Sequence, residues 1–336
     1  METGRAPVAR TEATPAALSS SDARLRRRKA VDKAARWVIA AIASTAIAAV
    51  ALIFVFLLRE ALPIFTSSTV HEEVTLGKML FAQEWRTGEP PYHAWQPVSK
   101  VPKYSLLPLL VGTFKVAIIA LLFAVPVSVL GAVFTSELAP RRVREFIKPA
   151  VELLAGIPSV VLGFFVLMVL ATQVQDIFGF QYRLNAIVAG IGLGLTIIPV
   201  IFTLSEDALT AVPPSYREAA FALGASRTRT AWSVILPAAS PGIFAAIVLG
   251  FGRAMGETMI VLMASGNAAI LSWDPTLPVR TVPATIAAEM GEVVVGGPHW
   301  TVLFVLGVLL LGLTIAFNGL SGWYVRRLRA KLGGSA

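Results

Sequence analysis

Two ionisable residues stand four positions apart inside a long apolar segment. Arg253 and Glu257 lie in the run Gly250–Met259, and this spacing predicts that both side chains share one face of a helix. An arginine at the centre of a membrane helix costs about 2.5–3.5 kcal/mol on insertion scales. A buried ion pair that fixes helix register is therefore one interpretation. An anion path is the other, because the planar guanidinium suits a bidentate oxyanion. Gly252 and Gly256 predict close helix contact beside the pair.

Three further polar residues are candidates for the same path. Thr258 follows the pair directly, Ser159 opens another apolar segment, and Lys115 is placed near the outer end of a third. Hydroxyl groups in membrane helices also bond their own backbone. A lysine near a helix end also snorkels to the headgroups. Each residue therefore has a structural interpretation beside the functional one.

The segment Pro213–Pro237 predicts a helical elbow. Its two leading prolines prevent the preceding helix from continuing, and Ser215 with Glu218 matches a capping box. Gly224 is suited to end the new helix in a left-handed conformation. Ser226 is suited to cap a second short helix that runs to Ile235. An amphipathic loop that only joins two membrane spans is the alternative interpretation.

The composition decides which class of protein carries these residues. The 336-residue chain is 56% hydrophobic and 15% charged, with a mean hydropathy of +0.72, whereas soluble domains carry about 25% charged residues. A soluble enzyme is excluded on this ground. Cysteine is absent and the three histidines have no ligand spacing, so we expect neither a metal nor another cofactor. The sequence has no phosphate-binding loop, so we expect any ATP hydrolysis to come from a partner.

Six apolar runs are long enough to cross a bilayer, which requires about 20 residues. Between the last two spans, Val282, Ile286 and Met290 recur at helical spacing and predict a short helix in the loop. In the fourth span, the glycines of Gly190–Gly194 predict close approach to a neighbouring helix. The predicted spans are Trp37–Leu58, Leu110–Thr135, Val151–Ala171, Ala186–Leu204, Pro241–Ala264 and Val302–Leu320.

The distribution of lysine and arginine sets the orientation. With the N-terminus inside, 20 of the 29 lie in cytoplasmic tails and loops, seven lie outside and two lie within spans, as the positive-inside rule requires. Both termini are then cytoplasmic, and nucleic-acid binding is disfavoured because the charge flanks membrane helices. The predicted organisation is a basic tail 1–36 with a disordered start, a six-helix domain 37–325 and a basic tail 326–336. The domain contains outer loops 59–105 and 265–299 and a cytoplasmic loop 213–237.

The cytoplasmic loop carries a recognisable pattern. Its motif positions are Glu218, Ala219, Ala220, Gly224, Val234, Leu236 and Pro237. They resemble the EAA loop of the permeases of ABC importers, with valine where that family usually has isoleucine. The resemblance implies an all-α integral membrane protein with the type I (MetI-like) permease fold. It also implies that the elbow docks on a cytoplasmic ATPase and passes its motion to the helices.

A second pattern indicates which solute is transported. The sequence GRAMGETM around Arg253 is similar to that of the PstC family of phosphate permease subunits, as are Trp95-x-Pro97, Gly112-Thr113 and Gly156–Val160. The resemblance implies a bacterial cell-membrane complex that imports inorganic phosphate. Its other members would be a sister permease PstA, two copies of the ATPase PstB and the phosphate-binding protein PstS. Membrane lipid surrounds it, and nucleic acid is not a partner.

Other functions stay open at this point. The same fold transports sulfate, molybdate or other solutes, and only the segment around Arg253 favours phosphate. A secondary transporter that uses Glu257 as a proton site would leave the elbow unexplained. A membrane scaffold in phosphate signalling is compatible with transport.

Overall fold

The computed structural model describes residues 15–84, 88 and 90–331. It forms two compact units, Met1–Phe56 and Leu57–Ala336, and each is described by itself. Helix α1, Pro15–Ala61, makes up the described part of the first unit and continues into the second. The predicted disordered start of the basic tail falls largely on residues 1–14, outside the described residues. From Pro15 onward the tail is helical.

The second unit is helical apart from one small two-stranded sheet. Strand β1, Trp95–Gln96, pairs antiparallel with β2, Lys103–Tyr104. Three π-helical turns, η1 to η3, interrupt the helices. The elements in chain order are α2 Pro63–Thr66, α3 Ser68–Glu73, α4 Leu76–Leu80, α5 Leu107–Val133, η1 Phe134–Leu138, α6 Arg141–Ala155, α7 Ser159–Phe165, η2 Val166–Leu170, α8 Ala171–Phe178, α9 Ala186–Thr210, α10 Pro214–Ala222, α11 Arg227–Thr230, η3 Ala231–Ile235, α12 Leu236–Gly256, α13 Met259–Ala264, α14 Val282–Glu289 and α15 Pro298–Lys331.

Within the described residues, six helical stretches are long and apolar enough to cross a membrane. Four of them contain predicted spans, which are confirmed, although these stretches extend up to eight residues beyond the predicted boundaries. The other two differ from the prediction in their boundaries. The six stretches are Val31–Thr66, Leu107–Leu138, Ser159–Phe178, Ala186–Thr210, Arg227–Gly256 and Pro298–Arg327.

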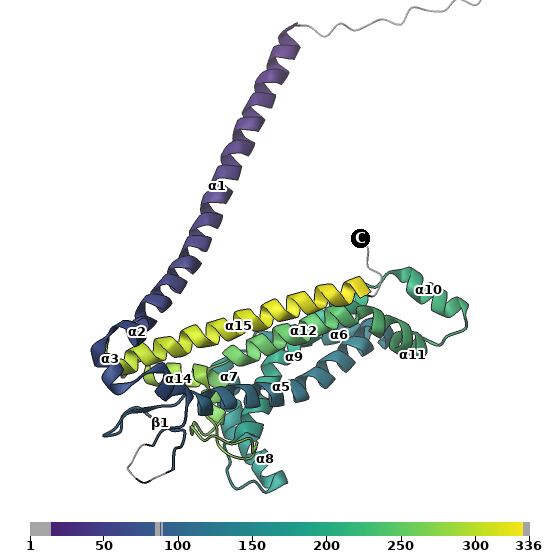
Figure 1. Ribbon diagram of the computed structural model, residues 1–336. Coiled ribbons are helices and arrows are strands. Elements are labelled where there is room, and N and C mark those ends of the chain that lie inside the picture. The colour runs from purple at the N-terminus through teal and green to yellow at the C-terminus, as the bar shows by residue number, and fades with distance from the viewer. Residues whose placement is uncertain (1–14, 85–87, 89, 332–336) are drawn as a thin grey trace, which may run out of the picture. The chain divides into compact units, whose positions relative to one another are not determined.

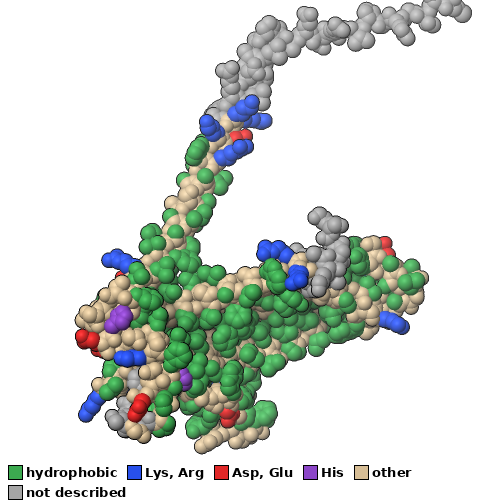
Figure 2. Space-filling view, viewed as in Figure 1, with side chains coloured by type: hydrophobic (Ala, Val, Ile, Leu, Met, Phe, Trp, Pro, Cys, Tyr) green, Lys and Arg blue, Asp and Glu red, His purple; other side chains and the backbone are tan. Residues whose placement is uncertain are grey.

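The long helices of the second unit connect two polar ends. Helices α10 and α11 lie at one end, whereas α2, α3, α14 and β1 lie at the other (Figure 1). Between these ends, hydrophobic side chains cover the flank of the helices, and most charged side chains gather toward the ends (Figure 2). An apolar flank between charged ends is the surface that a bilayer requires.

Helix α9 forms the centre of the second unit and packs closely along α5. A Cβ atom added at Gly190 would lie 2.5 Å from Ile119, and one added at Gly194 would lie 2.6 Å from Phe123. Side chains at these positions would push the helices apart, so the predicted role of the glycines is confirmed. Helix α9 is also the most enclosed of the six stretches, with 61% of its apolar window buried.

Three aromatic rings join α5, α12 and α15 beside this centre. The ring centroids of Phe114, Phe251 and Phe317 lie 5.1–6.4 Å apart, a range favourable for aromatic pairs. The close glycine contacts of α12 are at Gly242 and Gly250, where an added Cβ would lie 2.5 Å from Ala208 and 2.7 Å from Ile201. The described residues leave open space at Gly256, so the prediction for that glycine is wrong within this chain.

The third span differs from the predicted Val151–Ala171. Helix α6 ends at Ala155, and a new helical stretch begins at Ser159 and continues to Phe178. Pro158 explains the break, because proline lacks an N–H and disfavours helical backbone at the residue before it. The segment before the break is therefore a separate helix, in which no residue is buried among the described elements.

The fifth span differs at both ends from the predicted Pro241–Ala264. Helix α11, turn η3 and helix α12 are continuous, so the stretch begins at Arg227. At its other end α12 stops at Gly256, and α13 begins only at Met259. Glu257 has extended backbone at this break. The predicted helix in the outer loop is present as α14.

Candidate coupling elbow and substrate path

The elbow begins with α10 and turns at Gly224. Gly224 has φ +79°, a left-handed conformation that glycine adopts without steric cost. The N–H of Ala225 donates to the carbonyl of Ala220 at 3.0 Å, and the N–H of Gly224 donates to that of Phe221 at 2.9 Å. These two bonds form a Schellman motif. The predicted helix end is therefore confirmed.

The start of α10 differs from the prediction. Helix α10 begins at Pro214, with Pro213 as its N-cap and no capping side chain. Ser215 therefore lies inside the first turn, and the predicted capping box with Glu218 is wrong. Proline is suited to the first helical position, because its fixed φ matches the helix and its missing N–H would have been unsatisfied there.

The second half of the elbow continues directly into a membrane span. Ser226 caps α11 as predicted, since its Oγ accepts from the N–H of Arg229 at 3.3 Å. The helix does not end at Ile235, however. Turn η3 bonds the N–H of Leu236 to the carbonyl of Ala231, five residues back, and Pro237 follows in the first turn of α12. A widened turn before the proline relieves the clash that its ring makes in a regular helix.

The motif residues divide into an exposed and a packed group. Glu218, Ala219, Gly224 and Pro237 are exposed, Val234 and Leu236 are half-buried, and Ala220 is buried. Large hydrophobic side chains are also exposed in and directly after α10: those of Tyr216, Phe221 and Leu223 are exposed by 50%, 47% and 89%. Exposed apolar side chains close together in the chain are candidates for contact with a partner.

Arg217 joins the elbow to the helices of the second unit. Its Nη2 and Nε lie 2.6 and 3.1 Å from the two carboxylate oxygens of Glu137 in η1. The same guanidinium donates to the carbonyls of Leu209 and Val212 at 2.9 and 2.8 Å. The hydrogen bond with Glu137 raises the pKa of Arg217 above its usual value. Neighbouring Glu206 of α9 accepts from two cations of α6, Arg144 at 2.7 Å and Lys148 at 2.8 Å.

The predicted ion pair on the fifth span is not formed. Arg253 lies in α12, but Glu257 lies in the break after it, so the two no longer share a helix face. Glu257 Oε1 instead accepts from the N–H groups of Thr258 and Met259, both at 3.2 Å. It thereby satisfies free donors at the start of α13. Among the described residues Arg253 has no ion-pair partner, and its side chain is exposed.

The two candidate hydroxyls lie on neighbouring elements. Thr258 Oγ1 donates to the carbonyl of Gly256 at 3.3 Å, in line with the structural interpretation. Ser159 is the first residue of α7, which packs on α13. At Gly163 an added Cβ would lie 2.9 Å from Met263 Sδ. The structure therefore brings the segments of Ser159 and Thr258 together.

Lys115 is buried rather than snorkelling. Its side chain is 4% exposed, and its Nζ donates to the backbone carbonyls of Ser272 and Asp274 at 2.9 and 3.0 Å. Thr113 Oγ1, two residues earlier, accepts from the N–H of Val282 at 3.0 Å. Gly112 has the carbonyl of Arg280 directly against it. This part of α5 therefore anchors the loop that follows α13.

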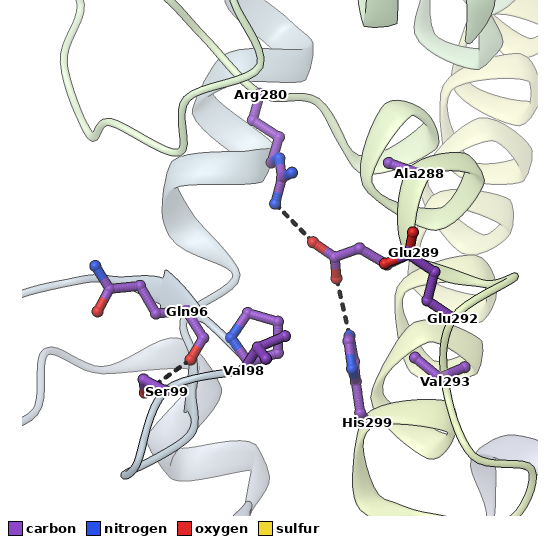
Figure 3. Close-up of a pocket in the computed structure, with 10 residues that line it drawn as sticks. Gln96, Val98, Ser99, Arg280, Ala288, Glu289, Glu292, Val293 and His299 are labelled. Carbon is purple, nitrogen blue, oxygen red and sulfur yellow. Dashed lines mark hydrogen bonds and ion pairs between the residues drawn. The ribbon is translucent and has the colours of Figure 1, made fainter.

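The end of the second unit that carries β1 and α14 contains a charged cluster that the sequence pattern did not single out. Glu289 Oε1 accepts from Arg280 Nη1 at 2.6 Å, and Oε2 lies 2.8 Å from His299 Nε2 (Figure 3). The indole N–H of Trp95 donates to both oxygens, at 3.0 and 3.2 Å. The cluster lines a cavity of about 670 Å³, with Gln96 and Ser99 on its other wall. No local motif signals this cluster, because Trp95 and Glu289 are 194 residues apart.

Electrostatics in the cluster favour the ionised carboxylate. Burial raises the pKa of Glu289, but the hydrogen bonds from His299 and Trp95 and the charge of Arg280 together bring it below its usual value. Tyr104 packs on Trp95 and His299, with ring centroids 5.9 and 5.8 Å away. Burial and the nearby carboxylates of Glu73 and Glu289 raise the pKa of Tyr104 to about 12. The phenol therefore stays neutral beside an ionised glutamate.

Two curated relatives extend over most of this chain. It is 38% identical over 224 residues to the "Probable ABC transporter permease protein YqgH" of Bacillus subtilis, covering 66% of this chain and 72% of the relative. It is 33% identical over 341 residues to the "Phosphate transport system permease protein PstC" of Mesorhizobium japonicum, covering 96% and 98%.

Solved structures of ABC transporters share the fold. A chain of a bacterial alginate ABC transporter, solved with an alginate pentasaccharide-bound periplasmic protein, superposes with a TM-score of 0.57 at 13% identity, covering 85% of this chain and 94% of that one. A chain of the MetNI methionine ABC transporter in an inward-facing conformation gives a TM-score of 0.50 at 20% identity, covering 66% and 94%. The predicted all-α permease fold is therefore confirmed.

The family match includes the elbow and all the residues of the candidate path except Lys115. Residues 124–330 match the family described as "Binding-protein-dependent transport system inner membrane component". This range contains Ser159, the whole elbow and the break after Gly256, whereas Lys115 precedes it. The chain is therefore a multi-pass membrane protein that belongs to the family of binding-protein-dependent ABC transporter permeases.

Proposed function

We propose that this chain is a permease subunit of an ATP-driven inorganic phosphate importer in the bacterial cell membrane, with both termini in the cytoplasm. The observation that carries the proposal is 33% identity to a PstC protein over 98% of that protein's length. The lysine and arginine distribution supports the orientation. The chain forms half of the translocation path and is not itself an enzyme, because a partner ATPase supplies the hydrolysis.

The elbow is the part that meets the ATPase. Three large apolar side chains, those of Tyr216, Phe221 and Leu223, are exposed on the elbow together with Glu218, and exposed apolar side chains suit a cleft on a soluble partner. Movement of that partner then passes through the packed motif positions into α12, with which the elbow is continuous. The coupling residues are Glu218, Ala219, Ala220, Gly224, Val234, Leu236 and Pro237.

Arg253 is the charged group on the path. Its exposed side chain lies within a membrane span, and a lipid-facing arginine is unfavourable. A second permease, PstA, completes a polar cavity around it in this proposal. Glu257 and Thr258 form the break that follows the helix of Arg253, and Ser159 begins α7, which packs on α13 after the break. Lys115 contributes from a distance, since it anchors the loop between α13 and α14 at the outer end.

The remaining partners follow from the physics of transport. A path must release its ion as well as bind it, so its affinity for the ion stays low. High affinity belongs to the phosphate-binding protein PstS on the outer side. Two copies of the ATPase PstB act on the elbows of the two permeases.

Labelled phosphate uptake tests the proposal. Cells that lack this chain, and lack a duplicate phosphate system, are compared with the same cells after its restoration. We expect restored uptake that ATP depletion abolishes and that excess sulfate does not suppress. Uptake that is unchanged by the chain would remove phosphate as the cargo and leave the permease fold standing.

Arg253→Gln tests the path separately. We expect reduced uptake by complexes that assemble normally, because the neutral amide no longer offsets the dehydration of the anion. Arg142→Gln is the matched control, since Arg142 is an exposed arginine of α6 at the cytoplasmic end. Normal uptake by the Arg253 variant would exclude Arg253 from the path.

A further inference from the structure

The contact of α10 with the other helices depends on few side chains. Of its nine residues, seven are exposed, Ala220 is buried and Arg217 is half-buried. Apart from the elbow's own α11 and η3, α10 packs little on the rest of the chain. A force applied to α10 therefore reaches the other helices either along the backbone or through these two residues.

Arg217 joins α10 to two other elements at once. Its guanidinium meets the carboxylate of Glu137 through two nitrogens, Nη2 at 2.6 Å and Nε at 3.1 Å. It also donates to the carbonyls of Leu209 and Val212 at the end of α9. Because the planar guanidinium donates hydrogen bonds from Nε and from both terminal nitrogens, its orientation is fixed as well as its position.

The pair is shielded from solvent and lies at the end of α5. The side chains of Arg217 and Glu137 are 23% and 10% exposed, so salt screens the pair less than it screens a surface pair. Glu137 lies in η1, which continues α5 without a break. The backbone joins α10 to α9 and, through the elbow, to α12. It does not join α10 to α5, which is reached through Arg217 and through the packing of α11 on η1.

We infer that the Arg217–Glu137 pair is a strut that transmits movement of α10 to α5 and α9, so that these helices move with the ATPase. Arg217 is in this role a positioning residue that touches neither phosphate nor ATP. The inference rests on the proposed function, because it requires that an ATPase moves α10. It adds a second route of coupling beside the continuous helix from α11 to α12.

The test measures ATP hydrolysis and phosphate uptake on the same vesicles. The complete complex is reconstituted with this chain as wild type, Arg217→Gln, Arg217→Lys, Glu137→Gln or the exchanged pair Glu137→Arg/Arg217→Glu. Arg142→Gln serves as the control with an equal change of charge. The quantity compared is phosphate imported per ATP hydrolysed, for complexes matched in their content of all subunits.

We expect Arg217→Gln to hydrolyse ATP near the wild-type rate but to import about tenfold less phosphate per ATP, as expected for the loss of one charge-assisted interaction. Arg217→Lys keeps the positive charge but loses the planar guanidinium. Its ratio of phosphate imported to ATP hydrolysed should lie between those of wild type and Arg217→Gln. The exchanged pair recovers part of the ratio, and Arg142→Gln keeps all of it. Where the glutamine variant does not assemble, the lysine variant and the exchanged pair decide.

Two results would overturn the strut. One is a wild-type ratio in assembled Arg217→Gln or Arg217→Lys complexes. The other is an exchanged pair that assembles but has a ratio no higher than that of the single variants. Failure of the proposed function looks different, because the wild-type complex would then import no phosphate and there would be no ratio to compare.

Discussion

Replacing Glu289 by glutamine measures how much the charge of this carboxylate stabilises the contact of strands β1 and β2 with α14. In the described outer region, the indole N–H of Trp95 is the polar contact of β1 with this helix, and it donates to an ionised carboxylate. Glutamine has nearly the same shape and still offers one neutral acceptor. The variant therefore changes the charge of the acceptor and leaves the packing of Trp95 on Tyr104 in place.

The expected magnitude follows from the type of hydrogen bond. A bond to a charged group contributes about 1.5–3 kcal/mol and a neutral bond about 0.5–1.5 kcal/mol, so the difference is about 1–1.5 kcal/mol. This difference raises the population of the locally open state of the β1–β2 loop by about 5- to 12-fold. Loss of the ion pair with Arg280 adds to the effect on α14, but it does not act directly on β1.

Amide hydrogen exchange in the assembled complex reports this opening. The informative amides are those of Ser105, which donates to Ala94, and Leu106, which donates to Met79. Their exchange should be faster in Glu289→Gln by the factor above. Glu292→Gln is the control, because Glu292 lines the same cavity but is exposed. Unchanged exchange in Glu289→Gln would show that apolar packing alone holds the loop, and the reasoning from charge would be wrong.

The pH dependence gives a second check on the same variant. The pKa of Glu289 is lowered in the folded chain, so its contribution is fully present above the usual pKa of glutamate. The contribution is lost as the pH falls through the lowered value. The ratio of the variant's exchange rate to the wild-type rate should therefore be constant at neutral pH and approach one only in acid below the usual glutamate range.

Three further predictions concern other contacts. Gly194→Val should reduce the yield of folded protein, because the new side chain would meet α5. Gly291→Val should not reduce it, because Gly291 lies in open space. Thermal unfolding of the two purified variants compares their stability. Lys115→Met leaves two loop carbonyls without their donor, so protease should cut residues 265–281 faster than in wild type. Glu206→Gln weakens the attachment of α6 by two cations, so trypsin should cleave α6 faster at its arginines; equal cleavage would show that packing holds this helix.

Hydropathy and local caps made much of the fold predictable. Four predicted spans lie inside membrane-length helical stretches of the structure, with boundaries that differ by up to eight residues, because a run of about 20 apolar residues has few alternatives to a membrane helix. The turn at Gly224 and the cap at Ser226 were predictable because both depend only on residues within one or two helical turns. The family resemblance then supplied the role of the elbow.

The errors come from positions where two local signals compete. At Pro158 the apolar run continues, but the proline ends the helix, and the hydropathy pattern gave the wrong boundary. After Gly256 the spacing of Arg253 and Glu257 predicted one helix face. The backbone instead breaks at Glu257, whose carboxylate accepts from the first N–H groups of α13. Spacing alone cannot distinguish a residue that continues a helix from one that starts the next.

The contacts that organise the two ends could not be predicted from a single sequence. Arg217 and Glu137 are 80 residues apart, and Trp95 and Glu289 are 194 apart. Each residue has ordinary surroundings in the chain and acquires its partner only when the helices pack. The sequence identified the charged residues but not which of them meet.

The anchoring of Lys115 also constrains the order of biosynthesis. Its acceptor at Ser272 lies 157 residues further along the chain, which a ribosome reaches about 8–30 s after the lysine at 5–20 residues per second. During this interval α5 is available for insertion while its ammonium group still lacks both carbonyls. The insertion machinery or the water at the membrane surface must solvate the charge until the later loop arrives. The outer end of α5 therefore reaches its final environment only after most of the permease has been synthesised.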